Sequence, residues 1–346
     1  MRKSANKSIL FICKVVKSST KILVGLCLLF LLVKDLSGLA GVPLARKKRN
    51  QVRCNPPLGR VMSKGDKRFE VRSLVCDGDK LEVLNEGKIK FLCFSTGKII
   101  DLSSGVVSSD KCKKPYLTDS VCRIDSRNFC PRTRKGGGTE NNEPIIIYPY
   151  HIPTLKPRPE VVWTPVTGAT SYKVRFDCHE FSWERDINQT RLAYPLEEKA
   201  LPSGRTCQIV VFAYKNDNLT NADQSVVLLL SEEEIKRIVD AIDQISKLNL
   251  PPDEAALDMD AVFIARNLFD ETLEKLNNVV TRDTRNPTIY RVLGDRYFQA
   301  GLLDQAKPQY LKALELLKTI NNPTELKKIQ EGLEVIDYYN QLPTSR

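Results

Sequence analysis

The sequence predicts a multidomain α+β protein in which a small β domain with disulfides and a β-sandwich precede an all-α helical array. Three observations predict this fold class. Every cysteine lies in the first 207 residues, short runs with β-strand alternation precede residue 230, and the hydrophobic period becomes 3.6 from Ser231 onward. At 346 residues the chain also exceeds one ordinary hydrophobic core.

The N-terminus has the pattern of an export signal. Lysines precede an apolar run from Ile22 to Val33, which is shorter than the roughly 20 residues of a membrane-spanning helix. Small residues lead up to Ala40, so we expect residues 1–40 to be a signal peptide cleaved after Ala40. The alternative is an uncleaved signal that anchors the chain in a membrane. In both cases the rest of the chain lies outside the cytoplasm, in the periplasm, the cell envelope or the extracellular space.

The cysteine distribution fits an oxidising compartment. Removal of the signal leaves eight of the ten cysteines, and these predict disulfides. Six lie in the front domain, and their pairing is open: Cys54, Cys76, Cys93, Cys112, Cys122 and Cys130. Zinc binding would call for closely spaced pairs, and no C-x-x-C occurs, so we expect no metal site.

Residues 41–130 read as the cysteine-rich β domain, with strands expected at 69–74, 81–84, 89–95 and 98–102. The order Gly-Asp-x-Leu from Gly78, then Leu-Cys-Phe-x-x-Gly-Lys ending at Lys98, loosely resembles FecR-like β domains. Residues 131–144 contain arginine, lysine, glycine and asparagine, which is typical of a flexible linker.

Residues 145–230 predict the β-sandwich. The stretch 161–174 (VVWTPVTGATSYKV) and the stretch 201–213 (LPSGRTCQIVVFA) resemble the B–C and E–F regions of a fibronectin type III domain. Cys207 stands where that family usually has its corner tyrosine. Trp163 is expected in the core, and the alternative is a sugar-stacking role for Trp163 or Trp183.

A disulfide between Cys178 and Cys207 follows from strand geometry. Alternate residues of a strand share one face, so Cys178 faces inward with Tyr172, and Cys207 faces inward with Ile209. Strands C and F of such a sandwich are antiparallel neighbours, so the end of C meets the start of F. We expect the two cysteines to be bridged.

Residues 231–341 predict helices. Ser231 and Glu234 form a capping box, and apolar residues from Ile235 to Ile245 (including Val239 and Ile242) make one stripe. Asn249 and two prolines then end this helix, and residues 324–341 suit a capping helix.

Within this segment, residues 290–313 place aromatic, small and aliphatic side chains at a regular spacing: Tyr290, Leu293, Gly294, Tyr297, Gly301, Ala306, Tyr310 and Ala313. The pattern resembles a tetratricopeptide (TPR) repeat. A weaker copy stands 34 residues earlier, with Asp260 in place of the small residue at Gly294.

The TPR resemblance implies a protein partner on the face lined by the first helix of each repeat. Carried over by position, that face presents Arg291, Asp295, Phe298 and Gln299. The alternative is a helical cap without an open groove.

The whole arrangement resembles a group of cyanobacterial exported proteins of unknown function, which implies architecture and compartment but no activity. No phosphate loop, G-x-S-x-G elbow or H-E-x-x-H motif occurs, so we expect neither an enzyme nor a cofactor.

The sequence therefore favours an envelope scaffold that binds an unknown protein. The alternative is a binding module for an anionic envelope polymer. The net charge is +11 over residues 41–156 and −5 over 231–346, so cations gather in the front domain: Arg46–Arg49, Lys64, Lys67, Arg68, Lys111, Lys113 and Lys114. These cations lack interleaved aromatic residues, which argues against nucleic acid.

Overall fold

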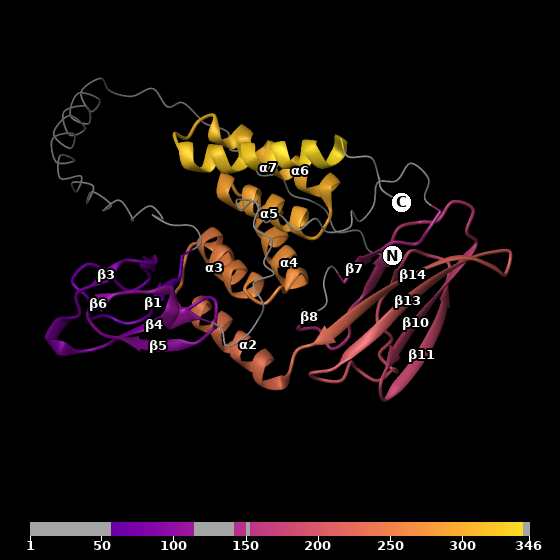
Figure 1. The fold of residues 1–346 in the computed structure, drawn as a ribbon, viewed down its shortest axis with the longest axis horizontal. Coiled ribbons are helices and arrows are strands. Elements are labelled where there is room, and N and C mark those ends of the chain that lie inside the picture. Colours follow the sequence, from indigo (N-terminus) through magenta and orange to yellow (C-terminus); the bar gives the residue numbers. More distant parts are fainter. Residues whose placement is uncertain (1–56, 114–141, 150–152, 342–346) are drawn as a thin grey trace, which may run out of the picture. The chain divides into compact units, whose positions relative to one another are not determined.

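A computed structural model describes residues 57–113, 142–149 and 153–341. The predicted signal peptide, Cys54, Cys122, Cys130 and most of the predicted linker lie outside these ranges. Within them the predicted fold class is confirmed: small β-sheets with disulfides, then sandwich-like sheets, then six helices (Figure 1).

The cysteine-rich β domain contains two small sheets. Four strands pair in the order β2-β1-β4-β5, and a separate pair joins β3 to β6. The strands are β1 (Gly59–Val61), β2 (Leu74–Val75), β3 (Lys80–Leu81), β4 (Ile89–Cys93), β5 (Ile99–Leu102) and β6 (Gly105–Val106). The expected hairpin is confirmed, since β4 pairs antiparallel with β5 and Gly97 takes a φ of +64° in the turn between them.

The strand expected at 69–74 is wrong. Only its last residue enters a strand, as the first residue of β2. The carboxylate of Asp66 accepts hydrogen bonds from the backbone N–H groups of Arg68, Phe69 and Glu82, which folds the chain into a turn. Arg72 then takes a positive φ of 79°, which a strand does not allow.

The disulfides of this domain are partly described. Cys93 at the end of β4 is bridged to Cys112, with their Cα atoms 5.6 Å apart. Cys76 is also disulfide-bonded. The bridges tie the domain together around a small core that includes Val61, Phe91 and Leu102.

The sandwich is built from a five-stranded and a three-stranded sheet. The larger has the order β11-β10-β13-β14-β8 and the smaller the order β12-β9-β7. The strands are β7 (Ile146–Tyr148), β8 (Pro153–Thr154), β9 (Val161–Trp163), β10 (Ser171–Cys178), β11 (Phe181–Ile187), β12 (Arg191–Leu192), β13 (Thr206–Lys215) and β14 (Asn218–Leu229). Figure 1 shows the long strands of the larger sheet side by side.

The predicted bridge of the sandwich is confirmed. Cys178 of β10 stands opposite Cys207 of β13, their Cα atoms are 4.4 Å apart, and they form a disulfide. Trp163 and Trp183 are both buried in the same core, so stacking of a sugar on either ring is contradicted. Trp183 donates a hydrogen bond to the hydroxyl of Tyr194.

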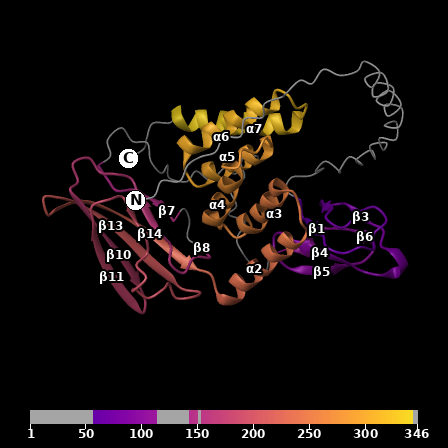
Figure 2. The same cartoon turned by 180° about the vertical axis from the view of Figure 1, so that it is seen from behind.

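Six helices follow: α2 (Glu232–Lys247), α3 (Pro252–Ile264), α4 (Phe269–Val280), α5 (Pro287–Gln299), α6 (Leu303–Leu317) and α7 (Pro323–Gln341). Ser231 caps α2 as expected, because its hydroxyl accepts a hydrogen bond from the Glu234 backbone N–H at 3.3 Å, and the same hydroxyl donates to Oε2 of Glu234 at 3.0 Å. Successive helices lie side by side in both views (Figures 1 and 2). No helix among the described residues is long and apolar enough to span a membrane.

The helices pair as repeats, with α3 and α4 forming the first and α5 and α6 the second. In the second repeat, the ring of Tyr310 lies against Gly294 of α5 and against Gly332 of α7. A Cβ atom on either glycine would come within about 3 Å of that ring, so both close approaches depend on glycine. Helix α7 thus caps the stack, as the sequence indicates.

Candidate partner-binding surface of the helical array

The four predicted partner-binding residues all lie on α5, but they do not form an open surface. Arg291 is 4% exposed and Phe298 is 8% exposed, and Asp295 and Gln299 are half-buried. Each of them has a partner inside the protein. The structure therefore corrects the expectation that Arg291 and Phe298 line an accessible groove.

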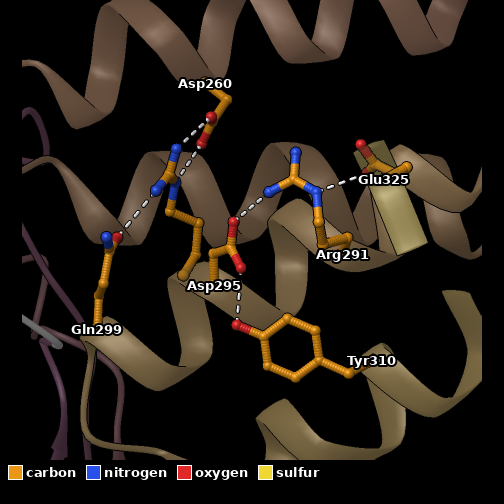
Figure 3. Close-up of polar contacts among 7 residues, drawn as sticks. Asp260, Arg291, Asp295, Gln299, Tyr310 and Glu325 are labelled. Carbon is orange, nitrogen blue, oxygen red and sulfur yellow. Dashed lines mark hydrogen bonds and ion pairs between the residues drawn. The ribbon is translucent and has the colours of Figure 1, made fainter. Parts of the chain in front are cut away.

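Arg291 lies at the centre of a buried polar network (Figure 3). Its Nε donates to Oε1 of Glu325 on α7 at 2.5 Å, and its Nη1 forms an ion pair with Asp295. Asp295 in turn accepts a hydrogen bond of 2.7 Å from the hydroxyl of Tyr310 on α6. One network thus joins α5, α6 and α7.

Burial and the neighbouring charges shift the pKa values of the residues in this network. Burial raises the pKa of Asp295 above its usual value, against the opposing effects of Arg291 and Arg296. Burial also raises the pKa of Tyr310, and the neighbouring Asp295 carboxylate adds to that rise. Burial alone would lower the pKa of Arg291, but Asp295 and Glu325 outweigh it, and the pKa lies above its usual value.

A second buried pair joins the two repeats. Asp260 of α3 accepts two hydrogen bonds from Arg296 of α5, from Nε at 2.8 Å and from Nη2 at 2.7 Å. Arg296 also donates to the side-chain oxygen of Gln299 at 2.9 Å. Gln299, one of the predicted binding residues, therefore accepts a hydrogen bond from this ion pair. The pair holds α3 against α5.

Phe298 is covered for a related reason. Its ring packs edge-on against Tyr339 of α7, with the ring centroids 5.9 Å apart. Helix α7 lies against the face of α5 that the TPR resemblance assigns to a partner. These contacts hold the stack together and take up the predicted binding residues.

The sequence contained a signal for one of these ion pairs. Arg291 and Glu325 are 34 residues apart, which is one TPR repeat, so opposite charges stand at equivalent positions of α5 and α7. The departure from the family pattern at Asp260 is likewise matched by Arg296 in the next repeat. A search for complementary charges 34 residues apart would have found the pair of Arg291 and Glu325, whereas Asp260 and Arg296 are 36 residues apart and fall outside that spacing.

The helical array leaves a groove elsewhere, between α2 and α4 with α3 beneath. This α2–α4 groove encloses about 270 Å³. Its apolar lining includes Ile245, Leu250, Met259 and Val279. Three of these side chains are buried and Leu250 is half-buried, so they form an apolar floor.

The rim of the α2–α4 groove is basic. Polar side chains from α2, from α4 and from the turn after α4 surround the floor: Ser246, Lys275, Asn278 and Arg282. None of the lining residues is acidic. Within the described part of the chain, neither Lys275 nor Arg282 forms a side-chain hydrogen bond or an ion pair. The two cations are therefore available to a bound group.

A short, partly exposed apolar strip, formed by Val239 and Ile242, lies on α2 before the groove. Val239 is 53% exposed, Ile242 is half-buried, and Ser246 follows at the groove rim. Spacings of three and four residues place these side chains on one face of the helix. The apolar stripe that the sequence indicates on α2 is thus wider than the face that the protein buries, because Ile238 and Ile245 alone are fully covered with Ala241.

The floor of the groove is held from both sides. Met259 stands between Asp258 and Asp260, and each of these carboxylates is buried against an arginine. Asp258 accepts from Nη2 of Arg60 in β1 at 2.8 Å. Burial raises the pKa of Asp258 to about 6, although Arg60 opposes this rise. Helix α3 therefore presents Met259 from a fixed position, which favours a pre-formed site.

The basic residues of the front domain do not form a comparable site. Lys64, Lys67, Arg68, Lys111 and Lys113 are exposed, and Arg46–Arg49 and Lys114 lie outside the described residues. Lys113 forms an ion pair with Asp110, and Arg68 lies over the ring of Phe69. No cluster of three or more potential metal ligands occurs among the described residues.

Comparisons with known proteins find partial likenesses. No protein-family model matches the chain, and no curated protein matches it. A solved fibronectin type III domain of the human collagen alpha-1(XX) chain is similar at 18% identity with a TM-score of 0.20, covering 24% of this chain and 78% of that chain. PcrH from Pseudomonas aeruginosa is similar at 17% identity with a TM-score of 0.26, covering 31% of this chain and 83% of that chain.

Proposed function

We propose that this chain is an exported scaffold protein that binds a protein partner through the α2–α4 groove of its TPR-like array. The observation that carries the proposal is the groove itself: an apolar floor, a rim with two unpaired cations among the described residues, and a short, partly exposed apolar strip on α2 beside it. A concave site with an apolar floor and a few placed polar groups is typical of binding sites.

The rigidity of the array supports the same proposal. Buried ion pairs fix α3, which lies beneath the groove, to α5 and fix α5 to α7, so the floor of the groove is attached to the rest of the array. A pre-formed surface loses less entropy when a partner binds, which raises affinity for a given contact area.

The compartment is part of the proposal. Two disulfides lie among the described residues, one in each β region, and disulfides persist outside the cytoplasm. The predicted signal at residues 1–40 agrees with export. The purified protein should begin near Gly41 when its N-terminus is determined by mass spectrometry. Peptides from residues 1–20 in the purified protein would instead favour the uncleaved anchor.

The binding proposal is tested with two matched variants of the full chain. Val239→Glu places a charge on the strip beside the groove, and Leu311→Glu places the same charge on α6, where Leu311 is 48% exposed. Tagged wild-type protein and both variants are used to recover partners from a cell-envelope extract after chemical cross-linking.

We expect the wild type and Leu311→Glu to recover the same partner and Val239→Glu to lose it. Both variants should keep the wild-type circular dichroism spectrum, because both positions are exposed. Equal recovery by Val239→Glu and the wild type would contradict the assignment of the groove as the binding site.

A further inference from the structure

The shape and charge of the α2–α4 groove specify the chemistry of its occupant. We infer that the groove takes an acidic peptide segment of the partner, which inserts one large apolar side chain onto the floor and places carboxylates against Lys275 and Arg282. This inference rests on the proposed function and specifies the partner of the same site.

The volume sets the size of the inserted group. The 270 Å³ of the groove lies just below the range of about 300–1,000 Å³ that small-molecule pockets occupy. A site of this size on a helical surface suits one anchoring side chain of a larger partner, because binding energy concentrates in such buried anchors. The floor of Ile245, Met259 and Val279 selects an aliphatic or aromatic anchor. Met259 adds a polarizable thioether, which packs well against an aromatic ring.

The basic rim of the groove indicates that the bound segment is acidic. Residues 231–346 carry a net charge of −5, so a rim with two cations and no carboxylate departs from the rest of this segment. Neither cation is neutralised by a described neighbour, whereas five other lysines of the array have carboxylate partners. Complementary charge across an interface gives specificity and speeds association.

The spacing of the two cations sets the length of the segment. Lys275 lies in α4 and Arg282 in the turn that follows it, seven residues later, so their Cα atoms are on the order of 10 Å apart. An extended peptide covers that distance in about three residues. Carboxylates two residues to either side of the anchoring residue share its face of the extended peptide, so they can reach both cations while the anchor occupies the floor.

Methionine methyl groups report directly on the floor. The chain has three methionines, Met1, Met62 and Met259, and Met259 lines the groove whereas Met62 does not. The full-length oxidised protein is labelled with methyl-¹³C methionine. It is titrated with an acetylated and amidated peptide of sequence Glu-Asp-Phe-Asp-Glu, with the same peptide carrying alanine for phenylalanine, and with Lys-Lys-Phe-Lys-Lys.

We expect the acidic phenylalanine peptide to shift the Met259 methyl resonance and leave that of Met62 unchanged. The alanine and lysine peptides should give no shift at the same concentration. The double variant Lys275→Glu, Arg282→Glu should weaken binding at least about tenfold, because two attractive contacts become repulsive. Lys318→Glu is the control, since Lys318 is exposed on the last turn of the array's second repeat and lies away from the groove lining.

Three results would overturn the inference: no Met259 shift with the acidic peptide, an equal shift with the lysine peptide, or a Met259 shift on raising the protein concentration alone. The last would show that a second copy of the chain fills the groove. If Val239→Glu loses its partner while the acidic peptide has no effect, the proposed function stands and the inferred partner chemistry fails. If the peptide binds while Val239→Glu keeps its partner, the proposed function fails.

Discussion

The two helical repeats place different residues at the same position of the first helix, and the difference changes what each repeat can do. The second repeat has Gly294 there, and the ring of Tyr310 fills the space beside it. The first repeat has Asp260, whose carboxylate reaches forward to Arg296 of the second repeat. At this position, Gly294 allows close packing within the second repeat, whereas Asp260 attaches the first repeat to the second.

In the repeat that matches the family pattern best, every residue of the first helix, α5, is buried or half-buried. Helix α5 is enclosed by α4, α6 and α7, and its polar side chains are used within the stack. The first repeat departs from the pattern, and it is there that the groove and the basic rim occur. A good match to a repeat pattern therefore indicates a well-packed unit and does not locate the binding surface.

The largest effect is expected from Arg291→Met. This change leaves Glu325 and Asp295 facing each other without their shared cation in a buried site. Breaking a buried ion pair costs about 3–5 kcal/mol. Chemical denaturation followed by far-ultraviolet circular dichroism should show this loss. An unfolding midpoint equal to that of the wild type would contradict the central place of the network in α5.

Asp260→Gly should have the second-largest effect and lower the free energy of unfolding by about 3 kcal/mol. The change restores the family residue, so pattern matching alone predicts a gain. The structure predicts a loss, because Arg296 loses both hydrogen bonds to Asp260, keeps its hydrogen bond to Gln299 and remains largely buried. Asp260→Asn is the control and should lose less, since the amide oxygen still accepts one hydrogen bond. A more stable Asp260→Gly protein would reverse the comparison between the repeats.

Gly332→Ala should have a smaller effect. The new Cβ atom would meet the ring of Tyr310 at 2.6 Å, and overpacking of a core typically costs about 1–3 kcal/mol. At Gly294 the same ring lies 3.0 Å from the added atom, so Gly294→Ala should cost less than Gly332→Ala. Thermal unfolding of the two variants ranks them directly. The reverse order would show that α7 adjusts its position more easily than α5 does.

The smallest effect on stability is expected from Val239→Ser. Its side chain is exposed on α2, and such surface changes usually stay within about 0.5 kcal/mol. Partner recovery should nevertheless fall, because the apolar strip beside the groove is interrupted. A marked drop in the melting temperature would place Val239 in the core and remove it from the proposed surface.

Local rules predicted much of the fold. The bridge from Cys178 to Cys207 followed from the period of two in a strand and from the pairing of neighbouring strands. The helix cap at Ser231 and the turn at Gly97 likewise depend on residues close together in the sequence. The strand expected at 69–74 failed because a single side chain, Asp66, redirected three backbone N–H groups.

The candidate site was harder to predict, because it depends on which helix covers which face. Nothing local in α5 shows that α7 will bury Phe298 against Tyr339 or that Glu325 will neutralise Arg291. The strip beside the groove shows the opposite case, because it stays partly exposed. Val239 and Ile242 belong to an apolar stripe that no described element covers completely. Amphipathic spacing identifies an apolar face but does not state whether the protein itself buries that face.

Site-specific photo-cross-linking tests most directly whether the first repeat binds the partner. The photoreactive amino acid p-benzoylphenylalanine is placed at Asn278 on the groove rim or at Gln299 on α5, and the full chain is irradiated in its native cells. We expect a cross-linked protein adduct from Asn278 and none from Gln299. An adduct from Gln299 and none from Asn278 would show that the partner binds along α5, and would contradict the account.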